Sequence, residues 1–167
     1  FIGDSTFFHS GITGLINAVY NGAKTSIFIL DNSTTAMTGH QPNPGVCTSV
    51  LGEGCNHLDI ESVVRGIGVT DVAKVKPFNM RGTLKTIEEM KARSGVRVII
   101  AEEPCMLFAR RTLKQNRPQV AEVATQGEEA LKCLAELACP AFRRGGTAEA
   151  PIVSVDESQC SGCMVCL

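Results

Sequence analysis

Two short strand-like segments, each followed by a turn of polar residues, constrain this chain more than any other feature. Phe1-Ile2 leads into Gly3-Asp4-Ser5-Thr6, and the strand-like segment 25–30 leads into Asp31-Asn32-Ser33-Thr34. The 25 residues from 6 to 30 that separate Ser5 from Asp31 leave room for one helix and one strand. Apolar residues at helical spacing in segment 7–20 predict that helix. We therefore expect both polar turns at the carboxyl edge of neighbouring parallel strands, where open α/β sheets bind ligands.

The following segments continue this alternation of strand and helix. A long polar stretch, 31–56, comes first, and connections of that length inside a compact domain are usually functional. We then expect helices at 59–66 and 82–93 and strands at 71–75 and 96–101. The pattern predicts an α/β fold, an open parallel sheet with helices on both faces. Its strands, ending at Ile2, Leu30, Val75 and Ala101, should share one direction.

Charge and hydropathy exclude several classes of protein. The net charge is −1 and the isoelectric point is near 6.3, so the clustered basic surface typical of partners of nucleic acids or anionic membranes is not expected. No apolar run approaches the ~20 residues that span a bilayer, and no secretory signal is visible, which favours a cytoplasmic location. The chain lacks an initiator Met and stops inside a cysteine motif, so we expect a fragment of a longer protein.

The residue types in the two polar turns suit a magnesium diphosphate. Mg²⁺ prefers hard oxygen ligands, which the Asp4 carboxylate, the Asn32 amide and the Thr34 backbone carbonyl can supply. Ser5 and Thr6 place an N–H group and a hydroxyl at the start of the following helix, where an anion is favoured. Asp and Asn are also common cap and turn residues, but the pairing of two such turns at this spacing favours the metal site.

The wider motif resembles a known family. Gly-Asp-Ser…Asp-Asn is similar to the thiamine diphosphate fingerprint, usually Gly-Asp-Gly followed by Asn-Asn, with Ser5 and Asp31 departing from it. The fuller strings Gly-Asp-Ser-Thr-Phe-Phe-His-Ser-Gly-Ile and Ile-Leu-Asp-Asn-Ser-Thr-Thr-Ala-Met-Thr-Gly-His-Gln-Pro-Asn-Pro-Gly resemble the α subunits of indolepyruvate ferredoxin oxidoreductases. This resemblance covers residues 1 to about 111, including Glu102-Glu-Pro-Cys-Met-Leu, and separately the end of the chain.

The resemblance implies roles for individual residues. Asp4, Asn32 and the Thr34 carbonyl would hold Mg²⁺, and Ser5 and Thr6 would contact the diphosphate. Thr35 would also contact the cofactor, because segment 35–41 should run past the thiazolium toward the substrate. The residues expected in the substrate pocket are Thr38, His40 and Gln41. We expect ordinary structural roles for His9 and His57.

The end of the chain carries a second motif. Cys160, Cys163 and Cys166 form C-x₂-C-x₂-C, the first three ligands of the bacterial ferredoxin run for a [4Fe–4S] cluster. Zinc sites normally use one such pair and a distant second pair. We therefore expect a thiamine diphosphate domain over 1–146, with a helix at 128–137 and a linker at 139–147. A truncated ferredoxin-like module should follow over 147–167. The other cysteines, expected to be buried free thiols, are Cys47, Cys55, Cys105, Cys133 and Cys139.

Both motifs together suggest oxidative decarboxylation of a 2-oxoacid, with electrons passing through clusters to ferredoxin. The resemblance implies an arylpyruvate such as indolepyruvate, coenzyme A as acceptor and a smaller β subunit. A non-oxidative 2-oxoacid decarboxylase would not need the cysteine run, and a plain iron–sulfur electron carrier would not need Asp4 and Asn32. A third possibility is that the fragment alone is inactive, because in the family the carboxylate that activates the cofactor lies on a separate pyrimidine-binding domain.

Overall fold

The structure, a computed structural model, describes residues 1–49, 51–52, 54, 56–105, 107–108, 120–160, 162 and 166. The chain divides into two compact units, 1–113 and 114–167, and each is described by itself. Among the described residues, no helix is both long enough and apolar enough to cross a membrane.

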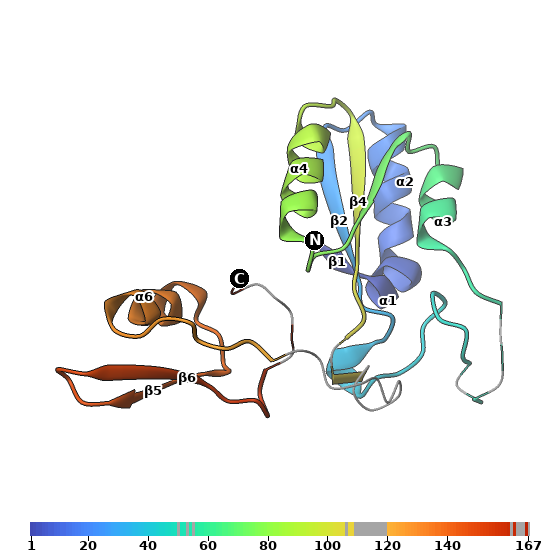
Figure 1. The fold of residues 1–167 in the computed structure, drawn as a ribbon. Coiled ribbons are helices and arrows are strands. Elements are labelled where there is room, and N and C mark those ends of the chain that lie inside the picture. Colours follow the sequence, from blue (N-terminus) through green and yellow to red (C-terminus); the bar gives the residue numbers. More distant parts are fainter. Residues whose placement is uncertain are drawn as a thin grey trace. The chain divides into compact units, whose positions relative to one another are not determined.

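A four-stranded parallel sheet forms the centre of the first unit (Figure 1). Its strands are β1 (Ile2–Gly3), β2 (Thr25–Asp31), β3 (Asp71–Val75) and β4 (Val96–Glu102), in the order β1-β2-β4-β3. All three neighbouring pairs are parallel, and Leu30 lies opposite both Gly3 and Ala101. The predicted fold class and the shared direction of the four strands are therefore confirmed.

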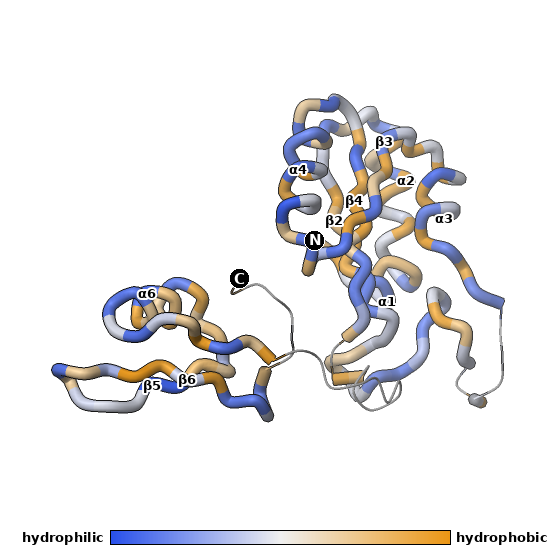
Figure 2. Tube along the Cα trace, viewed as in Figure 1, coloured by the Kyte–Doolittle hydropathy of each residue, from blue (hydrophilic) through white to orange (hydrophobic). Residues whose placement is uncertain are grey.

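Helices cover both faces of this sheet (Figure 1). On one face, α2 (Ile12–Tyr20) and α3 (Ile60–Gly66) enclose a buried cluster in which Leu15 and Val64 meet Ile29. On the other face, α4 (Met80–Lys91) contributes Met90 to a cluster with Ile99. Successive strand side chains point to opposite faces, and both faces are covered by helices. Hydrophobic residues therefore predominate along β2 and β4, whereas α4 alternates in hydropathy (Figure 2).

The first helix begins earlier than the sequence suggests. We expected it from Phe7, but α1 (Asp4–Thr6) starts at the end of β1 and continues through a π-helical turn, Phe7–Gly11, into α2. A Cβ at Gly11 would lie 2.5 Å from Ile2 Cδ1, so a larger residue there would require the end of the Ile2 side chain to shift. The helix expected at 82–93 likewise starts earlier, at Met80, after Asn79, whose side chain caps the Gly82 N–H at 3.2 Å.

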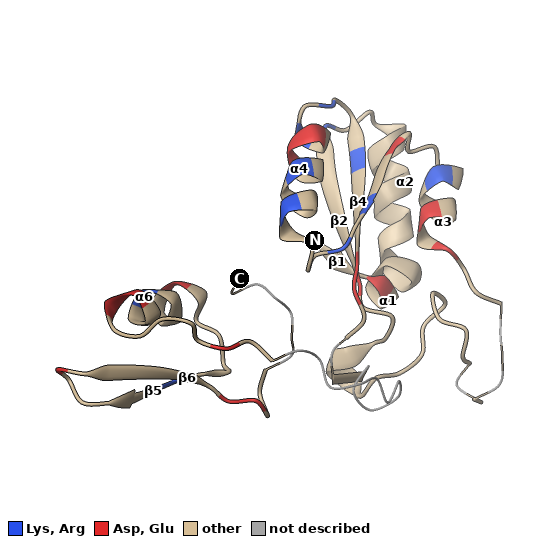
Figure 3. Cartoon of the chain, in the orientation of Figure 1, with Lys and Arg blue, Asp and Glu red and all other residues tan. Residues whose placement is uncertain are grey.

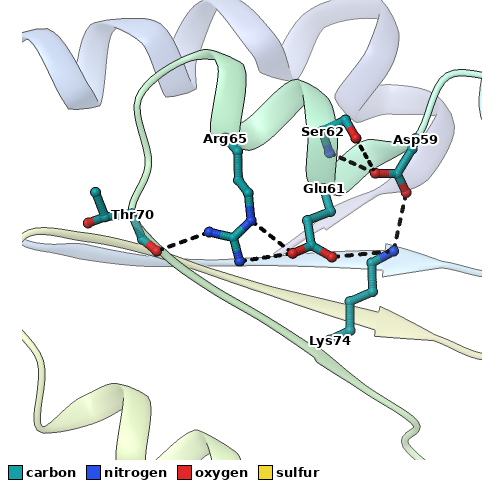
Figure 4. Close-up of polar contacts among 6 residues, drawn as sticks. All are labelled: Asp59, Glu61, Ser62, Arg65, Thr70 and Lys74. Atoms are coloured by element: carbon teal, nitrogen blue, oxygen red, sulfur yellow. Dashed lines mark hydrogen bonds and ion pairs between the residues drawn. The ribbon is translucent and has the colours of Figure 1, made fainter.

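A polar cluster connects α3 to β3 (Figure 4). Asp59 Oδ2 caps α3 by accepting 2.7 Å hydrogen bonds from the backbone N–H and the hydroxyl of Ser62. Its Oδ1 lies 3.2 Å from Nζ of Lys74 on β3, and Lys74 also pairs with Glu61 at 3.5 Å. Arg65 completes the cluster through a 2.9 Å ion pair with Glu61. The cap explains why the helix expected at 59–66 begins at Ile60.

The second unit contains α6 (Glu128–Leu137) and a hairpin of β5 (Phe142–Gly146) and β6 (Pro151–Val155). The predicted bounds of α6 are confirmed. The prediction of a linker at 139–147 is wrong, since most of this segment forms β5, which pairs antiparallel with β6. This pairing joins segments on either side of the predicted domain boundary between residues 146 and 147. The assignment of a thiamine diphosphate domain and a ferredoxin-like module stays a prediction.

Candidate functional site

Acidic residues meet at the carboxyl edge of the parallel sheet. Asp4 follows β1 directly, and Asp31 and Glu102, the last residues of β2 and β4, lie opposite each other in the sheet register. Acidic residues accordingly appear on α1 and at the carboxyl end of β4 in Figure 3. The two polar turns recognised in the sequence therefore share one edge of the sheet.

Asp4 is held in a defined orientation by two hydrogen-bond donors. Its side chain is buried, and the residue is 4% exposed. Oδ1 accepts a 2.8 Å hydrogen bond from the Ser5 N–H, and Oδ2 accepts a 3.0 Å hydrogen bond from Nδ2 of Asn43. In the part of the chain that the structure describes, no Lys, Arg or His forms an ion pair with Asp4.

Asp31 shows the electrostatic consequence of this crowding. Burial raises the pKa of Asp31, and the carboxylates of Asp4 and Glu102 raise this pKa further. The 2.9 Å hydrogen bond that Asp31 Oδ1 accepts from the Ser33 N–H has the opposite effect and lowers it. Neighbouring carboxylates repel each other when both are ionised. A cation at this edge would relieve that repulsion.

Asn32 and Thr34 occupy the turn between β2 and the long polar loop. Asn32 Oδ1 accepts a 3.2 Å hydrogen bond from the Thr34 N–H, and Thr34 is 2% exposed. The backbone carbonyls of Asp31 and Asn32 accept 3.0 Å hydrogen bonds from the N–H groups of Glu103 and Cys105. Hydrogen bonds thus connect the segment after β2 to the segment after β4 at this edge of the sheet.

These oxygen donors suit Mg²⁺ with a diphosphate, the group that the sequence predicts. Mg²⁺ binding requires few protein ligands because phosphate oxygens and water supply the others. Among the described residues, no group of three or more His, Cys, Asp or Glu side chains could hold a metal ion. The predicted set is of a different kind, because it consists of one carboxylate, one amide and one backbone carbonyl. The ligand roles of Asp4, Asn32 and Thr34 stay predictions, as do the diphosphate contacts of Ser5 and Thr6.

The loop that follows closes on itself. Thr35 and Gln41 pair through a 2.9 Å hydrogen bond from the Thr35 N–H to the Gln41 carbonyl, and the His40 N–H donates to the Thr35 carbonyl at 3.0 Å. At the tip, the Thr38 hydroxyl donates to Gln41 Oε1 at 2.6 Å, and the Gln41 amide donates to the Thr38 carbonyl. Met37, which directly precedes Thr38, is fully exposed.

A pocket of about 470 Å³ opens beside this loop. His40 lines it in a left-handed backbone conformation, φ 62°, with its ring stacked on Phe108 at a centroid distance of 5.6 Å. His40 Nδ1 is buried and has no hydrogen-bond partner among the described residues. Of the three predicted pocket residues, His40 and Gln41 line this pocket, and Thr38 does not. The lining residues are Ser33, Thr34, His40, Gln41, Pro42, Gly45, Val46, Cys47, Thr48, His57 and Phe108.

The terminal cysteine motif is only partly described. Cys160 is 8% exposed, and its N–H donates to the Asp156 carbonyl at 3.0 Å in the turn after β6. Cys163 lies outside the described residues, so the cluster stays a prediction. The expectation of buried thiols is wrong for Cys47 and Cys133, which are exposed because each lies on a solvent-facing loop or helix surface. Cys105 and Cys139 are half-buried, and Cys55 lies outside the described residues.

Asn43 is the site residue that sequence reasoning missed. It is 6% exposed and contacts Asp4 across 39 positions of the chain. The local string Asn43-Pro-Gly45 signals a turn, and Oδ1 does accept a 2.9 Å hydrogen bond from the Gly45 N–H. Nothing in that string indicates the partner of the Asn43 amide.

Comparisons with known proteins found one family model and several relatives that match this chain. Residues 1–101 match the family model described as thiamine pyrophosphate enzyme, C-terminal TPP binding domain. The chain is 43% identical over 99% of its length to the indolepyruvate oxidoreductase subunit IorA of Archaeoglobus fulgidus, and 42% identical over its full length to that of Methanothermobacter thermautotrophicus. It is 37% identical over 99% of its length to the Pyrococcus horikoshii subunit. The chain spans between 21% and 26% of the length of these relatives.

Proposed function

This chain belongs to the thiamine pyrophosphate enzymes, in the family of their C-terminal TPP-binding domain, and from that premise we propose that it holds the magnesium diphosphate of a 2-oxoacid oxidoreductase. The observation that carries the proposal is the position of Asp4 and Asn32 after two paired parallel strands, with Asp4 buried and without a cationic partner among the described residues. A buried carboxylate is costly unless it is paired or binds a metal.

Different residues bind the metal ion and the diphosphate. Asp4, Asn32 and the Thr34 carbonyl hold Mg²⁺, whose charge offsets the repulsion among the carboxylates at this edge. Ser5 and Thr6 contact the diphosphate at the start of the long first helix, and Thr35 contacts the cofactor beside them. When bound, thiamine diphosphate supplies carbanion stabilisation at a former carbonyl carbon, which permits decarboxylation of a 2-oxoacid.

The substrate is proposed to be an arylpyruvate such as indolepyruvate. The relatives are named for indolepyruvate, and the stacked rings of His40 and Phe108 give the pocket an aromatic wall. Offset stacking favours a further aromatic ring by about 1 kcal/mol beyond its burial. The pocket volume of about 470 Å³ lies within the usual range of about 300–1,000 Å³ for small-molecule sites. His40 and Gln41 line this space, and Thr38 fixes Gln41.

The whole enzyme is proposed to act in the cytoplasm with further components. Cys160, Cys163 and Cys166 would ligate a [4Fe–4S] cluster that passes electrons to ferredoxin, coenzyme A would accept the acyl group, and a smaller β subunit would complete the assembly. The spacing of these cysteines in the sequence supports the cluster.

The test uses the full-length protein that contains this chain, with its partner subunit. Calorimetric titration should show thiamine diphosphate binding that requires Mg²⁺, and indolepyruvate should reduce ferredoxin only when coenzyme A is present. Metal-independent cofactor binding would contradict the assignment of Asp4 and Asn32. Release of CO₂ and an aldehyde without reduction of ferredoxin would instead favour the non-oxidative decarboxylase.

A further inference from the structure

Asn43 uses both ends of its buried side-chain amide. Its Nδ2 donates to Asp4 Oδ2 at 3.0 Å, and its Oδ1 accepts the Gly45 N–H at 2.9 Å. The residue is 6% exposed, so water does not compete effectively for either contact. Asn43 therefore connects the turn after the loop of His40 directly to the carboxylate beside β1.

The turn that presents Asn43 packs closely against the ring of Phe8. A Cβ at Gly45 would lie 2.9 Å from Cε2 of Phe8 and 3.1 Å from Asn43 Oδ1, so Gly45 packs closely against the aromatic ring. Phe8 belongs to the π-helical turn that follows Asp4, and its ring packs edge-on against Phe7 at 5.7 Å. Asn43 and Asp4 are thus supported by the same helical segment.

Both oxygens of the Asp4 carboxylate already accept a hydrogen bond within the protein. Oδ1 accepts the Ser5 N–H at 2.8 Å and Oδ2 accepts Asn43 Nδ2. An ionised carboxylate has about four lone-pair sites, and a cation that binds both oxygens symmetrically needs the two inner ones. Two oriented donors fix the plane and direction of the group and so restrict how a cation can approach it.

We propose that Asn43 is a positioning residue that orients the Asp4 carboxylate to bind a cation through one oxygen, and that it thereby favours Mg²⁺ over Ca²⁺. This inference rests on the magnesium site of the proposed function. Mg²⁺ demands near-ideal octahedral geometry at about 2.0–2.1 Å, which suits single oxygens. Ca²⁺ is larger, accepts six to eight ligands and often binds a carboxylate through both oxygens. Selectivity follows because the rigid carboxylate cannot turn to offer its second oxygen.

The test compares the metal dependence of cofactor binding in the full-length protein and in its Asn43→Ser variant. Serine can still accept the Gly45 N–H in a turn, but its hydroxyl is too short to reach Asp4. Half-saturating concentrations of Mg²⁺ and Ca²⁺ are measured by calorimetric binding of thiamine diphosphate. Loss of a hydrogen bond to a charged group should shift the Ca²⁺-to-Mg²⁺ ratio toward Ca²⁺ by about tenfold.

Asn79→Ser is the matched control, because Asn79 also accepts a backbone N–H, that of Gly82, but caps α4 instead of contacting Asp4. The control should leave the metal ratio unchanged. If Asn43→Ser does not fold, Asn43→Thr also offers a short hydroxyl that can accept the Gly45 N–H without reaching Asp4, and it should shift the ratio in the same direction.

An unchanged ratio in a folded Asn43 variant, with or without an equal loss of both affinities, would overturn the positioning role. That result would leave the proposed function standing, since the parent protein would still bind the cofactor with Mg²⁺. A parent protein whose cofactor binding needs no divalent cation would overturn both.

Discussion

The imidazole of His40 stacks on the ring of Phe108, with centroids 5.6 Å apart and an angle of 26° between the planes. The two residues come from different connections, one from the loop after β2 and one from the segment after β4. Hydrogen bonds from Glu103 to Asp31 and from Cys105 to Asn32 hold these connections together. The predicted substrate pocket and the predicted metal site are therefore built on the same pair of strand ends.

We expect His40→Gly to weaken substrate binding without weakening the fold. The left-handed backbone at His40, φ 62°, is costly for a residue with a Cβ, so glycine relieves strain of about 1 kcal/mol or more. It also removes the ring that stacks on Phe108, which should raise KM for indolepyruvate about tenfold. Steady-state kinetics and thermal unfolding of the full-length enzyme measure the two effects.

Ala138→Gly is the control for this variant, because Ala138 has φ 45° at the end of α6 in the second unit and does not line the pocket. It should raise the unfolding temperature of its unit and leave KM unchanged. An unchanged KM in His40→Gly would remove His40 from the substrate pocket.

Asp4→Asn should abolish magnesium-dependent binding of thiamine diphosphate, and it should lose one hydrogen bond, because an amide can accept only one of the two donors that Asp4 accepts. The amide keeps the shape of the side chain and removes one of the carboxylates that crowd Asp31. We expect affinity to fall at least about a hundredfold, because a charged ligand of the cation is lost. Calorimetric titration with circular dichroism as a folding check measures this. Asp71→Asn, at the first residue of β3 and therefore at the opposite edge of the sheet, should bind the cofactor normally.

Periodicity predicted the sheet well because its strands are buried on both faces. Val96–Glu102 is almost uninterrupted in apolar residues, and a segment of that kind belongs in a parallel sheet. The same reasoning missed β5, since Arg143-Arg-Gly-Gly146 has no apolar pattern and is held in place by its partner β6. It also missed the contact of Asn43 with Asp4, which depends on how a long loop folds back and leaves no local pattern.

Cys160→Ser tests the predicted cluster in the full-length protein. A [4Fe–4S] cluster needs cysteine thiolates, so loss of one ligand should lower bound iron and sulfide and the visible absorption after anaerobic reconstitution. Ser158→Ala, in the same turn, removes only the hydroxyl that donates to Asp156 and should retain the cluster. Stoichiometric zinc without sulfide in the parent protein would make the motif a structural zinc site and would remove the proposed electron acceptor.

The cap and ion pair of Asp59 predict a pH-dependent contribution to stability. Hydrogen bonds from Ser62, with the nearby ammonium of Lys74, lower the pKa of Asp59 from 3.8 to about 2. Because the pKa is lower in the folded state, the stabilisation is complete above the unfolded value of 3.8 and is lost as the pH falls through about 2. The side chain is 41% exposed, so solvent screens the ion pair and the cap dominates.

Asp59→Ala should therefore reduce the free energy of unfolding by about 1 kcal/mol at pH 7. Urea denaturation across this range should show the two proteins converging near pH 2, and a constant difference down to that pH would show that the carboxylate charge contributes nothing. Asp59→Ser, which keeps a neutral cap, should lose less stability at pH 7 and vary less with pH.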